Sequence, residues 1–139
     1  MATEETRRFL RAWFDAVERG DGAAAMAALS DDILLEVPER EHGQSIAWGG
    51  CWRGKAQAGE AFRVRDQAID VLEFALVDLL VDGERAVALS RERNRDKASG
   101  ETHEIGIIQW IEVRNGMICR IRAFDDPWPV ASGPGSTEG

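Results

Sequence analysis

The chain has 139 residues, of which 44% are hydrophobic and 30% charged, and this size and balance are typical of one globular domain. Its formal net charge is -8 and its pI about 4.8, so repulsion disfavours nucleic acid and anionic membranes as partners. No apolar run reaches the roughly 20 residues that a membrane span needs, and the N-terminal residues are polar. With two cysteines, too few for a disulfide framework, the composition predicts a cytoplasmic protein.

The N-terminal half predicts three helices. Thr3 is expected to cap the first, whose apolar residues recur at helical spacing until Gly20 ends it. Asp21 is expected to cap a short, alanine-rich second helix that runs to about Leu29. The third helix is expected from Ala56 to Ile69.

Strands dominate the rest of the chain. They are expected at Ile33 to Val37, Val71 to Val81, Arg85 to Lys97, Glu101 to Arg114 and Met117 to Phe124, with tight turns at Asp82-Gly83, Ser99-Gly100 and Asn115-Gly116. Helices gathered on one face of an antiparallel meander predict an α+β domain. We expect this single domain to span residues 1–130, followed by a disordered tail over 131–139, which is rich in Gly and Ser.

The stretch from Glu39 to Gly54 holds four Gly and two Trp and is expected to be irregular. Loops longer than about 12–15 residues are uncommon in compact domains and are often functional lids. Trp48 and Trp52 are therefore expected to cover a ligand. Trp13, on the first helix, is either core or part of the pocket mouth.

One face of the predicted sheet mixes small, polar and apolar side chains. A two-residue turn at Ser99-Gly100 would pair Glu92 with Ile107 across the hairpin, and the shared face would then collect Ser90, Glu92, Asn94, His103, Ile105, Ile107 and Gln109. A packed core rarely contains such a mixture, because buried polar groups need partners. Apolar walls with a few placed polar groups are typical of a small-molecule pocket.

The strand expected from Glu101 to Arg114 is apolar on both faces, since Ile108 and Trp110 point opposite to Ile105 and Ile107. The expected register pairs Leu89 with Trp110, with Val87 and Ile108 beside them. Because helices can cover only one face, a second copy of the sheet is the simplest cover, which predicts a homodimer. The alternative is that the C-terminal segment around Trp128 folds over this face.

Several segments resemble the nuclear transport factor 2-like superfamily, which includes SnoaL-like polyketide cyclases, ketosteroid isomerases and limonene-epoxide hydrolases. They are RFLRAWFDAVERGD, SDDILLEVP, WRG and VRNGMICRIRAF, and the resemblance extends from about Thr3 to Trp128. It implies a cone-shaped α+β fold, with a curved, mostly antiparallel sheet wrapped on three helices around an internal pocket. It also implies a dimer across the outer sheet face.

The catalytic residues of these enzymes carry over only in part. Where the epoxide hydrolases have Arg-x-Asp, this chain has Ser90 and Glu92, and where they have a second Asp on the last strand it has Ala123. The ketosteroid isomerases use a Tyr, of which this chain has none, and a base at the position of Val37. Asp125 and Asp126 could form a turn or supply the carboxylate that Ala123 lacks.

The last strand can face either way. A strict hairpin at Asn115-Gly116 would turn Arg120 and Arg122 into the pocket, whereas the resemblance places Cys119, Ile121 and Ala123 there. Two arginines in an apolar cavity would need anionic partners. We therefore expect a β-bulge that restores the family orientation.

The pocket pattern predicts a site for a small, mostly apolar molecule. Together with it, the resemblance implies an enzyme that catalyses cyclisation, isomerisation or epoxide opening on a polyketide-, steroid- or terpenoid-like molecule, without a cofactor or a metal. Glu92 would be the general acid or base and Glu36 its partner across the cavity, although Glu92 could instead pair with an arginine and Glu36 could be solvent-exposed. His103 is either a proton shuttle or a rim residue. The expected substrate-binding residues are Trp13, Leu34, Trp48, Trp52, Ser90, Asn94, His103, Ile105, Ile107, Gln109, Ala123 and Trp128. The alternative is a non-catalytic ligand-binding module.

Overall fold

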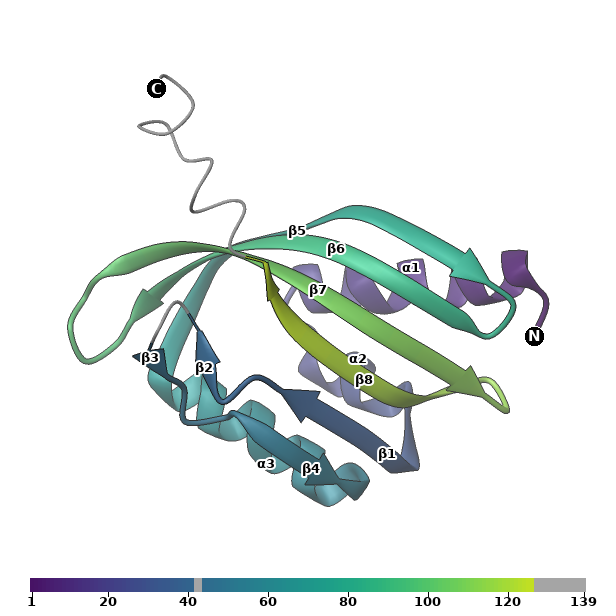
Figure 1. Ribbon diagram of the computed structural model, residues 1–139, viewed down its shortest axis with the longest axis horizontal. Helices are drawn as coiled ribbons and strands as arrows, with labels where there is room; N and C mark the ends of the chain where they lie inside the picture. The colour runs from purple at the N-terminus through teal and green to yellow at the C-terminus, as the bar shows by residue number, and fades with distance from the viewer. Residues whose placement is uncertain (42–43, 127–139) are drawn as a thin grey trace.

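The computed structural model describes residues 1–41 and 44–126 (Figure 1). Its helices are α1 (Thr3–Glu18), α2 (Gly22–Ala27) and α3 (Gly54–Ala68). Its strands are β1 (Leu29–Val37), β2 (Arg40–Glu41), β3 (Gln44–Ser45), β4 (Gly50–Arg53), β5 (Ile69–Asp82), β6 (Arg85–Asp96), β7 (Thr102–Arg114) and β8 (Met117–Asp126). The predicted α+β class is confirmed, and none of the described helices is long and apolar enough to cross a membrane.

Six strands form one curved sheet in the order β4-β1-β8-β7-β6-β5. β1 runs parallel to β8, and every other neighbouring pair in this sheet is antiparallel. The sheet curls around the helices, with α1 packed on β5 and α3 on β1 and β4 (Figure 1). The described part of the chain therefore has a concave face turned toward the helices and a convex outer face.

The described residues of the stretch from Glu39 to Gly54, which was expected to be irregular, include the short strands β2, β3 and β4. β4 pairs with β1, so that Trp52 lies opposite Leu35 and Cys51 opposite Glu36, while β2 and β3 form a separate hairpin. Short strands with glycine at or beside them give a weak sequence signal, because glycine contributes no side chain to the apolar pattern.

The predicted N-cap is wrong for α1 and confirmed for α2. Ala2, not Thr3, is the N-cap of α1: the Ala2 amide donates to the Glu5 carboxylate at 3.1 Å, and Thr3 Oγ1 instead accepts from the Gly83 amide at 2.9 Å. Asp21 caps α2 as predicted, accepting from the Ala24 amide at 3.0 Å.

The β6–β7 hairpin differs from the prediction by two residues. Its connection spans residues 97–101 rather than a two-residue turn, and Glu92 lies opposite Ile105 instead of Ile107. The Asp96 carboxylate accepts from the Ala98 amide at 2.8 Å, which favours the longer turn. Because side chains alternate with a period of two, the shift leaves each residue on its predicted face.

The β7–β8 hairpin contains the expected bulge. Val113 pairs with Ile118 but Glu112 pairs with Arg120, so Cys119 is the extra residue. Beyond it, Ile121 is buried in the core while Arg120 faces outward. Cys119, expected in the pocket, lies at the bulge, where its thiol donates to the Glu112 carbonyl at 3.4 Å and burial raises its pKa.

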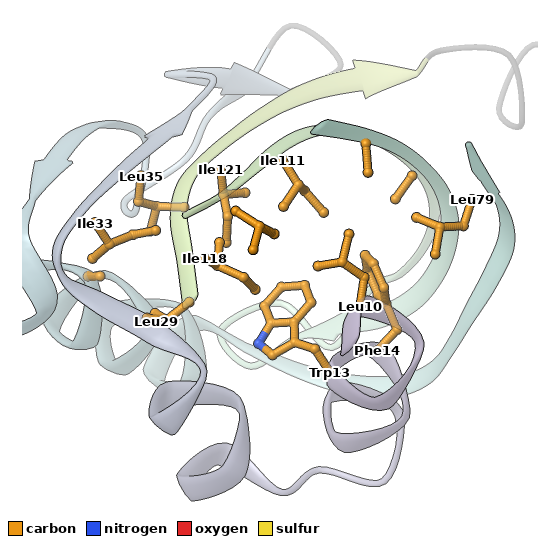
Figure 2. Close-up of a cluster of buried hydrophobic side chains, with 14 of the residues drawn as sticks. Leu10, Trp13, Phe14, Leu29, Ile33, Leu35, Leu79, Ile111, Ile118 and Ile121 are labelled. Carbon is orange, nitrogen blue, oxygen red and sulfur yellow. The ribbon is translucent and has the colours of Figure 1, made fainter. Parts of the chain in front are cut away.

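The core fills one end of the space between sheet and helices (Figure 2). Leu10 and Phe14 of α1 pack there with Ile111, Ile118 and Ile121 of the sheet. Figure 2 shows these side chains pointing toward one another inside the curl of the sheet. The cavity borders this core, and Trp13, Phe14, Leu35 and Ala61 belong to both.

Candidate functional site

A cavity of about 560 Å³ lies between the concave face of the sheet and the three helices. This volume is within the range of small-molecule sites, roughly 300–1,000 Å³. Most of its wall is apolar, and aromatic side chains contribute from helices, loop and sheet: Trp13, Phe14, Trp48, Phe62 and Phe74. The Trp13 indole is fixed by a 3.0 Å hydrogen bond from Nε1 to the Ala25 carbonyl, and the Phe14 ring stacks on Phe74.

A buried ion pair is the main polar feature of this cavity. Glu92, on β6, is 3% exposed, and its Oε1 accepts from the Arg65 guanidinium, which α3 places against it. The Asn94 amide donates to the other carboxylate oxygen at 3.0 Å. Both oxygens are thus held, and the negative charge of Glu92 is compensated by a cation in direct contact, as a buried carboxylate requires.

Arg65 was not among the residues predicted from the sequence. Its side chain is 24% exposed and borders the cavity beside Glu92. The signal was present, because Ala58, Ala61, Phe62 and Arg65 share one face of α3 by helical spacing. A charged side chain on an apolar helix face needs a partner inside the fold.

Seven of the predicted site residues border the cavity. They are Trp13, Trp48, Glu92, Ile105, Ile107, Gln109 and Ala123. Ser90 and Asn94 are buried on the same face of β6 but do not border the cavity. Within the described residues, Gln109 Oε1 and Ser90 Oγ are buried without a hydrogen bond, so Gln109 offers a polar atom to a ligand.

Three predicted residues lie elsewhere. His103 is exposed near the end of the β6–β7 hairpin, with Nε2 at 3.8 Å from the Glu101 carboxylate. Trp52 packs against the core and donates from Nε1 to the Trp48 carbonyl at 3.0 Å, so it supports Trp48 rather than bordering the cavity. Leu34 is absent from the cavity wall in the described structure. Trp128 lies outside the described residues.

The expected position of Glu36 is wrong. On β1, Leu35 and Val37 border the cavity, so the intervening Glu36 faces the outer side of the sheet. There its carboxylate accepts from Arg120 Nε at 2.9 Å, and this bond raises the pKa of Arg120. Glu36 therefore does not face Glu92 across the cavity.

A second carboxylate borders the cavity at the end of β8. The strand continues through Asp125 and Asp126, so the expected turn is not formed there. Asp125 lines the cavity, whereas Asp126 does not. Asp125 lies opposite Ile107 and Glu92 lies opposite Ile105, so the two acidic residues are separated by the width of β7.

Known proteins match this chain in family and in fold. The SnoaL-like domain family matches residues 10–121, and no curated protein matches. Among solved structures, a nuclear transport factor 2-like protein of unknown function from Burkholderia pseudomallei is 20% identical with a TM-score of 0.77, covering 94% of this chain and 96% of the other.

Two further structures carry names that suggest chemistry. A candidate polyketide cyclase from Xanthomonas campestris is 18% identical over 89% of this chain and 92% of its own, with a TM-score of 0.71. A candidate ketosteroid isomerase from Kribbella flavida is 20% identical over 89% and 79%, with a TM-score of 0.66. At these identities the likeness shows the fold alone. The family match over residues 10–121 and the curled sheet around a cavity agree, and the chain belongs to the SnoaL-like domain family of the nuclear transport factor 2-like superfamily.

Proposed function

We propose that this protein is a cofactor-independent enzyme that transfers protons on a small, mostly apolar polyketide-, steroid- or terpenoid-like molecule. The reaction would be a cyclisation, an isomerisation or an epoxide opening. The observation that supports it is the buried Glu92 carboxylate at the wall of an aromatic cavity, held by Arg65 and Asn94. A positioned carboxylate within reach of a bound substrate is suited to general acid–base catalysis.

The geometry suggests a role for each polar group. Glu92 accepts one hydrogen bond on each oxygen, and a carboxylate has about four lone-pair positions, so it retains capacity for a substrate proton. Arg65 has further N–H groups and borders the cavity, so it can stabilise negative charge that develops on a substrate oxygen. Asn94 positions the carboxylate, and Gln109 Oε1 can accept from a substrate hydroxyl.

The alternative is a binding module that holds the same kind of molecule without changing it. It is favoured by Ala123, which stands where the epoxide hydrolases have an Asp, and by the absence of Tyr from the sequence. Both alternatives use the same cavity, so they differ in turnover and not in binding.

Proton exchange in D2O separates the two alternatives. We expect the protein to accelerate hydrogen–deuterium exchange beside the carbonyl of an apolar cyclic ketone, or water addition to an apolar epoxide, measured by NMR against buffer alone. The physical reason is that Glu92 is held at the cavity wall, where a bound substrate would contact it. Saturation-transfer signals without exchange or hydration for every compound of both classes would instead support the binding module.

We also propose that the outer face of the sheet pairs with a second copy of the chain. Apolar side chains gather there on four adjacent strands, and we call them the outer patch: Leu80, Val87, Leu89, Ile108, Trp110 and Phe124. Trp110 lies opposite Val87 instead of the predicted Leu89, but the patch remains continuous. Leu80 is 66% exposed and Phe124 is 41% exposed. A two-fold contact lets this patch cover itself.

Replacing Trp110 by Glu tests this assembly. We expect the wild type to sediment as a dimer at micromolar concentration and Trp110→Glu as a monomer, because the substitution places two like charges in an apolar contact. Ala27→Glu, which adds the same charge on exposed α2, is the control and should remain dimeric. A monomeric wild type, or a dimeric Trp110→Glu protein, would reject this interface.

A further inference from the structure

We infer that the cavity selects an apolar ring compound that carries a basic amine over the same compound carrying a carboxylate. The inference rests on the proposed function only in that the cavity must bind a small apolar molecule. It concerns the charge of the ligand, which the family does not determine, and it follows from the charged and aromatic groups in the cavity wall.

Carboxylates outnumber cations in this wall. Among the described residues that line the cavity, five are acidic and two are basic: Asp21, Asp66, Asp70, Glu92 and Asp125 against Arg65 and Lys97. Apolar walls reduce the screening of these charges relative to open water. The wall therefore repels an anionic ligand and attracts a cationic one.

Both cations are already committed to protein partners. Arg65 contacts the Glu92 carboxylate. Lys97 Nζ donates to the Asp66 carbonyl at 2.6 Å and lies 3.7 Å from the Asp70 carboxylate. A ligand carboxylate beside Arg65 would lie next to the like charge of Glu92, and one beside Lys97 would compete with Asp70. Drawing Arg65 away from Glu92 would leave that carboxylate buried without its cation, which is strongly unfavourable.

The same wall suits an ammonium group. The aromatic side chains of Trp13, Trp48 and Phe62 border the cavity, as do Phe14 and Phe74, and the faces of aromatic rings attract cations. Asp66 and Asp70 are exposed where α3 leads into β5, so they lie at the mouth. We therefore place the amine of the ligand at this mouth beside the Asp66 carboxylate, because Lys97 lies against the other carboxylate, Asp70. Its ring system would lie among the aromatic side chains inside.

A matched series of three compounds tests the preference. Naphthylmethylamine, naphthalenemethanol and naphthoate, substituted at the same ring position, have similar size and differ in charge at pH 7. Isothermal titration at low ionic strength should give a Kd for the amine at least about tenfold lower than that for naphthoate, with the alcohol between them.

Two variants locate the effect. Asp66→Asn combined with Asp70→Asn should reduce the ratio of the naphthoate Kd to the amine Kd at least about threefold. The reason is that the mouth loses its negative charge and Lys97 loses a partner. Asp15→Asn removes the same kind of charge from an exposed position of α1 that does not line the cavity, and it should leave the ratio unchanged.

The outcomes separate this inference from the proposed function. If naphthoate binds as tightly as the amine or more tightly, the inference is wrong while the cavity remains a ligand site. If the ratio survives in the Asp66→Asn, Asp70→Asn protein, the mouth is not where the amine binds, and the inference is also wrong. If none of the three compounds binds, both the inference and the proposed ligand cavity are rejected.

Discussion

Replacing Arg65 by Met should lower the free energy of unfolding by about 3 kcal/mol, because it leaves the Glu92 carboxylate buried without a counterion. Removing one partner of a buried ion pair typically lowers the free energy of unfolding by about 3–5 kcal/mol. We expect the lower end of this range because the Arg65 side chain is 24% exposed. Urea denaturation followed by circular dichroism measures this change.

A matched control lies two residues earlier on the same helix. Arg63 pairs with Glu60, but both side chains are about half exposed, at 55% and 47%. Exposed pairs contribute little, so Arg63→Met should change the free energy of unfolding far less than Arg65→Met does. Arg65→Met and Arg63→Met thus compare the effect on stability of losing the same side chain from a buried ion pair and from an exposed one on the same helix.

A second substitution tests whether the lost free energy of unfolding arises from the uncompensated charge of Glu92. Glu92→Gln removes the negative charge and keeps an acceptor for the Asn94 amide, so the protein with both Arg65→Met and Glu92→Gln should regain roughly 2 kcal/mol. A loss below about 1 kcal/mol for Arg65→Met, or no recovery in the double variant, would contradict the ion pair as described.

The sequence predicted most of the fold because its helices and long hairpins are locally encoded. Asn115-Gly116 forms the turn expected of this dipeptide, with positive φ at both residues. The bulge at Cys119 was predicted from a conflict, since two arginines would otherwise have entered an apolar space. Alternation on β6 placed Glu92 on the buried face even though the predicted register was shifted by two residues.

The candidate site was less predictable because its key contact joins distant segments. Arg65 and Glu92 are 27 residues apart and meet only when α3 packs under the sheet. Spacing within one helix or one strand shows which face a residue occupies but not what it meets across the layers. Glu36 was expected to face Glu92 across the cavity, whereas the alternation of β1, which turns Leu35 and Val37 toward the cavity, turns Glu36 outward to Arg120.

The contact between Glu92 and Arg65 also bears on the departures from the family pattern. Ser90 stands where the epoxide hydrolases have an Arg, yet a cation still reaches the acidic residue, here from α3. Asp125 borders the cavity near Ala123, where those enzymes have an Asp. Charged groups of the same kinds are thus present, supplied by different positions.

Replacing Glu92 by Gln is the most direct test of the central claim, that Glu92 transfers a proton to or from a molecule in this cavity. Gln has almost the same shape, and its one carbonyl oxygen can still accept from Arg65, while its NH2 group takes the place of the other oxygen and can donate to the Asn94 amide oxygen once that amide rotates. It cannot carry the proton. General acid–base catalysis contributes about 100- to 10,000-fold to a rate. The matched control is Glu104→Gln, an exposed position on the neighbouring strand β7.

The measurement follows the ketone or epoxide that the wild type turns over fastest, with turnover from NMR and Kd from titration. The account predicts that kcat falls at least about 100-fold in Glu92→Gln while Kd changes less than about threefold, and that Glu104→Gln behaves as the wild type. A Glu92→Gln protein that keeps wild-type turnover would contradict the account and remove Glu92 from the chemistry.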